Sequence, residues 1–167
     1  NNPVWKTIAL VGLGAGGHGY FALDITDPDS PSHLFAIEND PTNQAVKHWD
    51  KDGFKNEFGY GGGSIDANMD YRKLGEAWST PRIIRVKHSG KDKWVAVFGA
   101  GYNGSVNPNY GSAVFVMDLE DEGRLLQKID ITDLSSSNIV NSVPADLTVI
   151  TADGTDKANY NGAMVYA

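Results

Sequence analysis

The sequence predicts an all-β fold, and three observations support this class. Short apolar runs rich in Val, Ile, Phe and Tyr alternate with clusters of Gly, Asn, Asp and Pro, as strands alternate with turns. No window of twelve residues has the apolar spacing of an amphipathic helix. The runs also recur in the same order along the 167 residues, which indicates repeated units of four antiparallel strands.

The first three strands are expected at 7–11, 20–26 and 33–37. The first run is apolar at almost every position, and the second combines aromatic and β-branched residues until Asp27 and Pro28 end it. These runs match the second to fourth strands of a unit, so 1–38 is predicted to be a partial unit. The stretch 38–77 is polar, contains Gly59 and Gly61–Gly63 and has little periodicity, and we predict an insertion loop there.

A complete unit of four strands is predicted at 78–133, with strands at 81–86, 94–98, 113–119 and 125–131. The first of these begins at Pro81, which is tolerable because the first residue of a strand need not donate a hydrogen bond.

A second partial unit is predicted at 139–167, with runs at 145–150 and 163–166. It starts with Asn141–Pro144, which echoes Trp78–Pro81 and places Ser142 at the position of Ser79. The total is nine strands. Repeated four-stranded meanders with an aspartate after the third strand are typical of β-propeller blades, so the prediction is a partial β-propeller of one full and two partial blades.

Composition excludes several classes of protein. The 14 Lys and Arg against 21 Asp and Glu give a net charge of −7, which argues against nucleic acid as a partner. No apolar run is long enough to span a membrane as a helix, and the absence of Cys excludes disulfides and thiolate metal sites. The chain starts without a leader and stops within a predicted strand, so we expect it to be a piece of something larger.

Two glycine motifs invite a nucleotide-binding interpretation. Both Gly12–Gly17 and Gly99–Gly104 satisfy G-x-G-x-x-G directly after a predicted strand. A dinucleotide site needs a helix after the motif, and here strand-like runs follow. Because the motifs stand at matching places in two units, we predict glycine-rich connections between strands and no nucleotide.

Three acidic groups carry oxygen ligands of the kind that calcium prefers. One has the spacing of calcium-loop positions 1, 3 and 5, although Tyr71 replaces the expected glycine; its residues are Asp66, Asn68 and Asp70, with Glu76 nearby. Another follows the 145–150 run, with Asp153, Asp156, Asn159 and Asn161 as candidate ligands. The third is Asp24, Asp27 and Asp29. The alternative for each is a solvated turn, and Asp24 and Asp118 are expected to cap the turns after their strands.

The residues do not predict an enzyme. The four His are scattered, there is no Cys nucleophile, and Ser64 does not stand in a nucleophile elbow. The polar stretch does contain a group of aromatic residues that could contact a sugar or protein partner or fold back as a lid: Trp49, Phe54, Phe58 and Tyr60.

Several motifs together resemble the C-terminal propeller domain of PilY/PilC-type type IV pilus proteins: Gly12–Pro28, Trp78–Ile83, Trp94–Asn103 and, in the next strand, Ala113–Leu119. The resemblance implies a modified seven-bladed propeller, exported to the cell surface, outer membrane or pilus tip. It implies a non-enzymatic role in pilus biogenesis, retraction control and adhesion, with pilus subunits or minor pilins and a host or surface receptor as partners. The family also has an aspartate-rich calcium loop, whose place here is Asp153–Gly162, without the family's alternating aspartates.

Two other classes stay open. One is a propeller like those of the quinoprotein dehydrogenases, which share the third-strand aspartate. Those enzymes usually carry an adjacent cysteine pair, so no quinone is expected in this chain without Cys. The other is a generic carbohydrate- or protein-binding propeller that uses 38–77 as its binding loop.

Overall fold

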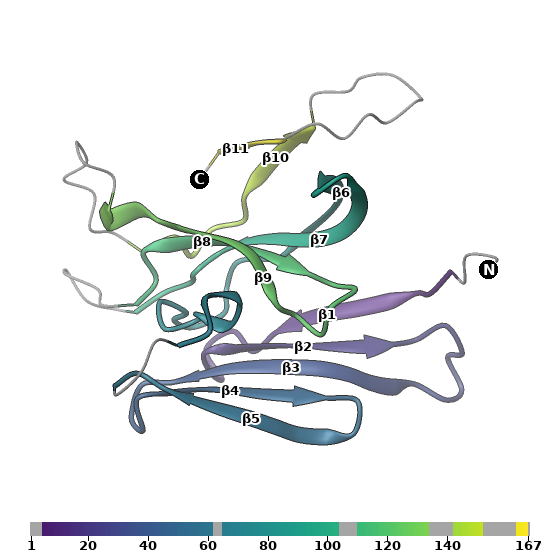
Figure 1. Ribbon diagram of the computed structural model, residues 1–167, viewed down its shortest axis with the longest axis horizontal. Coiled ribbons are helices and arrows are strands. Elements are labelled where there is room, and N and C mark those ends of the chain that lie inside the picture. Colours follow the sequence, from purple (N-terminus) through teal and green to yellow (C-terminus); the bar gives the residue numbers. More distant parts are fainter. Residues whose placement is uncertain (1–4, 62–64, 104–109, 134–141, 152–162, 167) are drawn as a thin grey trace.

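A computed structural model describes residues 5–61, 65–103, 110–133, 142–151 and 163–166. These residues form three antiparallel sheets that succeed one another along the chain (Figure 1). The first sheet contains β1 (Ile8–Gly12), β2 (Gly19–Asp24), β3 (Ser32–Asp40), β4 (Ala45–Asp50) and β5 (Gly53–Gly59). The second contains β6 (Arg82–His88), β7 (Lys91–Gly99), β8 (Ala113–Asp118) and β9 (Leu125–Asp130), and the third contains β10 (Thr148–Thr151) and β11 (Ala163–Tyr166).

All three sheets are meanders in which each strand pairs with the next one in the sequence. Two single turns of 3₁₀ helix, η1 (Ala67–Met69) and η2 (Ile131–Asp133), stand in the connections. The all-β prediction is confirmed, and a strand is present at each of the nine predicted places. In the described part of the chain, no helix is long and apolar enough to cross a membrane.

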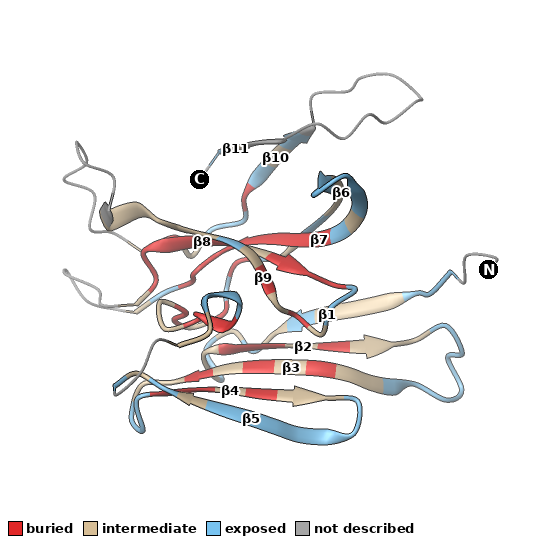
Figure 2. Ribbon diagram, in the orientation of Figure 1, coloured by how far each residue is buried: buried red, intermediate tan, exposed pale blue. Residues whose placement is uncertain are grey.

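The prediction of an insertion loop over 38–77 is wrong in its first half. There β3 continues to Asp40, and β4 and β5 extend the sheet to five strands. In β4 the buried residues are Ala45, Val46 and the polar His48, so the strand lacks a regular apolar alternation. The Nε2 of His48 lies 2.9 Å from the carbonyl oxygen of Glu122. The outer strand β5 is exposed at nearly every position and offers no apolar alternation (Figure 2).

The first two sheets repeat each other in detail. A register shift falls between Ala22 and Leu23 in β2, and a matching one falls between Val116 and Met117 in β8. The aspartate that ends each of these strands caps the following turn. Asp24 accepts a hydrogen bond from the backbone N–H of Thr26 (3.0 Å), and Asp118 accepts one from that of Glu120 (2.8 Å). These two hydrogen bonds confirm the predicted caps. In addition, Lys6 forms an ion pair with Asp24, and Lys93 forms one with Asp118.

The glycine motifs allow the backbone of the next sheet to cross closely. A Cβ at Gly12 would lie 2.6 Å from the carbonyl oxygen of Ala77, and a Cβ at Gly99 would overlap that of Val143. Two residues later, the N–H of Gly14 donates to Ala77 O (3.2 Å), and that of Gly101 donates to Val143 O (3.0 Å). Gly14 and Gly101 both have positive φ, which L-residues adopt at a cost. The connecting role predicted for these motifs is confirmed.

These crossings correct the predicted alignment of the repeats. Val143 occupies the place of Ala77, because each accepts from the second glycine of the preceding motif. Ala145 therefore corresponds to Ser79, and the echo that matched Ser142 with Ser79 is shifted by three residues. The similarity between Asn141–Pro144 and Trp78–Pro81 gave the wrong alignment. The backbone crossing, rather than the shared serine and proline, sets which residues of the two connections correspond.

The core lies between successive sheets (Figure 2). Between the first and second sheets, Tyr20, Phe98, Phe115 and Tyr71 form a chain of rings with centroids 4.4, 5.7 and 5.1 Å apart. A smaller cluster of mainly Val and Leu side chains joins the second and third sheets. Burial of such side chains is the main source of folding free energy, about 1.5–3 kcal/mol for each large one.

Buried Ser79 links the three sheets. Its carbonyl oxygen accepts from the Tyr20 hydroxyl of the first sheet (2.7 Å), and its Oγ accepts from the N–H of Gly99 in the second (2.9 Å). The same Oγ lies 2.9 Å from the carbonyl oxygen of Ala145, to which it donates, in the segment that enters the third. The connections 65–81 and 142–147 are thereby fixed at one end of the sheets (Figure 1).

Gly99→Ala is expected to destabilise the chain by about 2–3 kcal/mol, because the new methyl group would force the Val143 backbone away from β7. The matched control is Gly61→Ala, where a Cβ meets nothing within 4 Å and φ is not positive. Urea unfolding at equilibrium measures both variants. Equal midpoints for the two would contradict the crossing geometry.

Candidate functional site

The acidic residues predicted as a calcium loop lie in the connection between the first and second sheets. Asp66 caps η1, accepting a 3.0 Å hydrogen bond from the backbone N–H of Asn68, and it pairs with Arg124 of the turn before β9. The side chain of Asp66 is thus already held by a local turn and by a guanidinium group.

Asp70 is buried and neutralised by two cations. It accepts two hydrogen bonds from Arg72, at 2.7 and 2.9 Å, and one from the Lys128 ammonium of β9 at 2.6 Å. Burial raises the pKa of the Asp70 carboxyl, but these two partners outweigh it and lower the pKa to about 2. This pairing holds the connection against the outer strand of the second sheet.

Glu76 is held elsewhere in the connection. Its carboxylate accepts a 2.9 Å hydrogen bond from the indole N–H of Trp78, and its backbone exchanges hydrogen bonds with Tyr102 (2.7 and 3.0 Å). Within the described residues, no three acidic or imidazole side chains gather as metal ligands. The structure therefore does not bring Asp66, Asp70 and Glu76 together. Calcium binding at this first loop stays a prediction.

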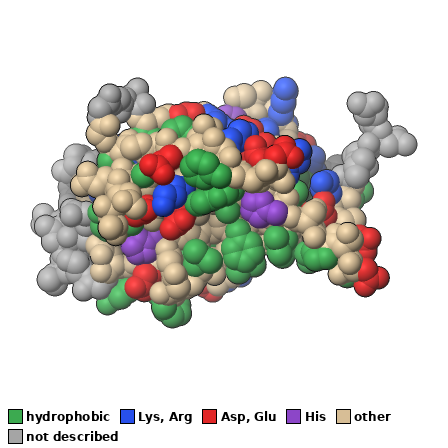
Figure 3. Space-filling view, turned by 90° about the horizontal axis from the view of Figure 1, so that it is seen from below, with side chains coloured by type: hydrophobic (Ala, Val, Ile, Leu, Met, Phe, Trp, Pro, Cys, Tyr) green, Lys and Arg blue, Asp and Glu red, His purple; other side chains and the backbone are tan. Residues whose placement is uncertain are grey.

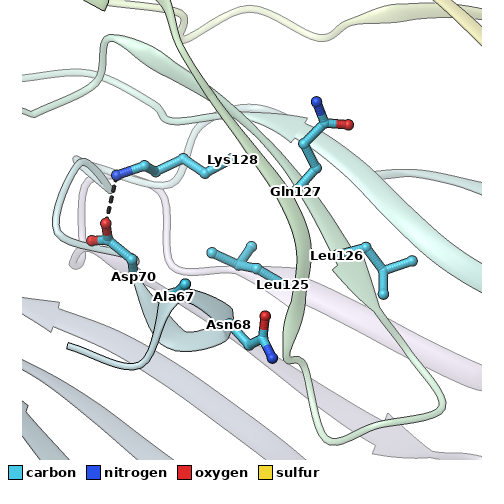
Figure 4. A pocket seen from close by; sticks show the side chains of 7 residues that line it. All are labelled: Ala67, Asn68, Asp70, Leu125, Leu126, Gln127 and Lys128. Carbon is cyan, nitrogen blue, oxygen red and sulfur yellow. Dashed lines mark hydrogen bonds and ion pairs between the residues drawn. The ribbon is translucent and has the colours of Figure 1, made fainter. Parts of the chain in front are cut away.

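An open hollow of about 270 Å³ lies beside the same connection. It is lined by Ala67, Asn68, Asp70 and the four residues 125–128 of β9. Figure 4 shows the Asp70 carboxylate and the Lys128 ammonium pointing toward each other at one end, with the leucine side chains away from them. The two charged side chains that line the hollow, Asp70 and Lys128, are paired with each other. This pair links the connection that contains η1 to β9, and it makes the hollow a poor site for an ion.

The other predicted calcium ligands lie outside the described residues. Asp153, Asp156, Asn159 and Asn161 all fall in 152–162. On either side of that segment, β10 and β11 form an antiparallel pair in which Thr151 lies opposite Ala163. Calcium binding there stays a prediction.

The four aromatic residues predicted as a partner-contact loop lie on or next to the hairpin β4–β5. Phe58 and Tyr60 pack against the core, and burial raises the pKa of Tyr60 to about 12. Trp49 and Phe54 are cross-strand neighbours instead, with ring centroids 5.6 Å apart in an edge-to-face arrangement. Phe54 is 58% exposed. The structure therefore separates two core residues from one pair that faces outward.

Comparison with known proteins places these features in a family. The model of the PilY1 beta-propeller domain matches residues 1–165. The chain belongs to this family. It is 32% identical over 127 residues to the type IV pilus biogenesis factor PilY1 of Pseudomonas aeruginosa UCBPP-PA14, covering 76% of the chain and 8% of that relative. A PilY1 homolog of Xylella fastidiosa Temecula1 is 27% identical over 160 residues, 95% of the chain and again 8% of the relative.

The chain thus spans about 8% of the length of the curated PilY1 relatives that it matches. No solved structure matches it. The resemblance drawn from the glycine, Trp78–Ile83 and Trp94–Asn103 motifs is confirmed, as is the partial propeller. The sheets are open, as expected for part of a PilY1 propeller.

The sequence analysis did not predict the basic side chains that pair with the aspartates of the first acidic loop. Arg124 and Lys128 come from the end of the β8–β9 turn and from β9, about 58 residues after the aspartates that they bind. One signal could have found them. In a chain with only 14 basic residues, these two stand on or beside a strand of the predicted blade that follows the acidic loop.

Asp70→Asn should lower the free energy of unfolding at pH 7 by about 2 kcal/mol, since it removes the charge that Arg72 and Lys128 bind. The folded pKa lies below the unfolded value of about 3.9. The stabilisation is therefore complete above that value and is lost as the pH falls toward 2. Urea unfolding at several pH values should show the difference between wild type and variant shrinking over this range.

Asp52→Asn serves as the control, because the Asp52 side chain is exposed and, in the part of the chain that the structure describes, forms an ion pair with its neighbour Lys51 alone. It should leave the unfolding midpoint nearly unchanged. A wild-type midpoint for Asp70→Asn at pH 7 would contradict the assigned role.

Proposed function

We propose that this chain is part of the propeller of a type IV pilus biogenesis factor. The observation that carries the proposal is the match of the PilY1 beta-propeller domain to nearly the whole chain, supported by relatives named as such factors. The match also favours this class over a quinoprotein dehydrogenase or a generic carbohydrate-binding propeller.

In this proposal the chain acts as a non-enzymatic scaffold and contact surface. The protein is exported to the cell surface, the outer membrane or the pilus tip, where it takes part in pilus biogenesis, retraction control and adhesion. Its partners are pilus subunits or minor pilins and a host or surface receptor. The ion pairs on Asp66 and Asp70 support a structural role for the carboxylates, because each already has a basic partner.

The outward pair of Trp49 and Phe54 is the proposed contact site for a protein partner. Aromatic side chains bury a large area with few rotatable bonds, and they dominate binding energy at many protein interfaces. The pair stands on a hairpin that has no counterpart in the second sheet, so it adds a feature to the common blade. Figure 3, seen from the side where β5 lies, shows hydrophobic side chains exposed among charged ones.

In the bacterium that encodes the chain, the double substitution Trp49→Ala with Phe54→Ala should reduce the amount of surface pilin. Loss of an aromatic contact costs about 2 kcal/mol, or roughly thirtyfold in partner affinity. Sheared surface pilin measured by immunoblot gives the readout, with total pilin and the melting temperature of the purified chain checked in parallel. Lys51→Ala, on the same hairpin, is the matched control and should leave surface pilin unchanged.

Two results would count against these ideas. Wild-type surface pilin in the double variant would contradict the contact site alone. Unchanged surface pilin after deletion of the whole gene would contradict the role in pilus biogenesis.

We also propose that calcium binds Asp153, Asp156, Asn159 and Asn161 and modulates the protein. Carboxylate and amide oxygens are the donors that this hard cation takes. Clustered carboxylates repel one another without the ion, so binding would favour an ordered loop between β10 and β11. The pairing of Thr151 with Ala163 supports this by holding the ends of the loop together.

Calcium at millimolar concentration should raise the melting temperature of the purified chain, and the combined substitution Asp153→Asn with Asp156→Asn should abolish the shift. Asp66→Asn tests the other loop and should keep the full response. Magnesium at the same concentration controls for ionic strength. A wild-type chain that does not respond to millimolar calcium would rule the site out.

A further inference from the structure

The connection between the first and second sheets carries exposed aromatic side chains where it meets the end of β7. Glu76 and Tyr102 form an antiparallel bridge with two backbone hydrogen bonds, at 2.7 and 3.0 Å. Directly paired residues point to the same side of a sheet, so these two side chains are neighbours. The indole N–H of Trp78 donates to the Glu76 carboxylate at 2.9 Å, which places the Trp78 ring beside the same carboxylate. We call Glu76, Trp78 and Tyr102 the aromatic platform.

The Trp78 ring is held in place although its side chain is 53% exposed. The hydrogen bond to Glu76 fixes the nitrogen side of the indole. The six-membered ring lies near Gly14, where an added Cβ would come 4.0 Å from Cζ3. Tyr102 is 46% exposed. An aromatic ring that is already oriented loses little conformational entropy when a ligand stacks on it, so the platform is preorganised for binding.

The repeated crossing does not require these side chains. The alignment of the two crossings and of the two glycine motifs gives the corresponding residues as Ser142, Pro144 and Ala15. The same backbone arrangement is thus built elsewhere in the chain without an aromatic ring or a carboxylate. Both sheets that flank the platform are present, and they leave its rings exposed. Adjacent exposed aromatic groups that the fold does not need mark a binding surface.

The carboxylate between the rings restricts the kind of ligand. Glu76 is partly exposed, and in the described chain its carboxylate is bonded to the Trp78 indole alone. A ligand that covers the rings must therefore offer donors to this carboxylate as well as apolar contact, because an unpaired carboxylate is costly to desolvate. A pyranose ring meets both needs, since it has an apolar C–H face and hydroxyl groups at its rim. The carboxylate and the net charge of −7 repel anionic sugars.

We propose that the aromatic platform binds a neutral glycan, with the C–H face of one pyranose ring stacked on the Trp78 indole. A hydroxyl group of the glycan donates to the Glu76 carboxylate, and Tyr102 contacts the glycan beside it. This inference goes beyond the role in pilus biogenesis and does not depend on it. It also uses a different segment of the chain from the Trp49–Phe54 pair, so each site can be tested separately.

Glycan binding by the full-length protein tests this assignment. The probes are neutral glycans printed on an array, each beside the same glycan capped with sialic acid. The wild-type protein should bind neutral glycans and should bind the capped forms about tenfold less, because the Glu76 carboxylate repels their charge. Glu76→Gln should remove this preference, which a purely structural role would not do. Absence of binding to every neutral glycan on the array would overturn the proposal.

Variants that remove a ring locate the binding site. Trp78→Ala and Tyr102→Ala should each lower the affinity for the strongest neutral glycan about tenfold, as measured by isothermal titration calorimetry on the full-length protein. Trp78→Phe keeps a ring for stacking and should recover part of the loss. Trp5→Ala is the matched control and should leave the affinity unchanged, since Trp5 is 73% exposed and stands outside the platform.

Melting temperatures show whether each variant is folded. The hydrogen bonds between Tyr102 and Glu76 are made by the backbone, so Tyr102→Ala keeps them and remains informative if Trp78→Ala does not fold. Wild-type affinity in a folded Tyr102→Ala or Trp78→Ala variant would place the glycan elsewhere and overturn the proposal.

Discussion

The close crossing of backbone over glycine is the constraint on which the rest of the structure depends. Where Ala77 passes Gly12 and Val143 passes Gly99, a side chain would occupy the space of a carbonyl oxygen. Each crossing fixes where the next sheet begins, and buried Ser79 joins the two crossings through hydrogen bonds. The aromatic chain from Tyr20 to Phe115 can pack only because the sheets start in register.

Several carboxylates of this acidic chain are neutralised by partners that are distant in the sequence. Asp70 takes Lys128 from β9 as well as nearby Arg72, and Asp66 takes Arg124. The aspartates whose spacing suggested a calcium loop thus form ion pairs that link the connection between the first and second sheets to β9 and the turn before it. The contact site that we propose is aromatic instead and consists of the pair formed by Trp49 and Phe54.

Much of the fold was accessible to sequence reasoning because its signals are local. The alternation of β-branched runs with Gly, Asn and Pro located all the strands except β4 and β5. Aspartates at the ends of two strands, Asp24 and Asp118, indicated the caps of the turns that follow. The sequence analysis did not predict β4 because one of its buried positions is the polar His48, which is hydrogen-bonded to the Glu122 carbonyl. It did not predict β5 because that strand is exposed at nearly every position. Of the four aromatic candidate residues, Trp49 and Phe54 face outward, whereas Phe58 and Tyr60 are partly buried and pack against the core.

The sequence alone determined the all-β class, the four-stranded repeat, the structural role of the glycine motifs and the family, since each is visible in runs and motifs of consecutive residues. Only the tertiary structure decided that Asp66 and Asp70 pair with basic side chains instead of lying together, and that Val143 takes the place of Ala77, so that Ala145 rather than Ser142 corresponds to Ser79. These outcomes depend on which distant segments meet. That choice is made by packing between sheets, which no local pattern of residues records.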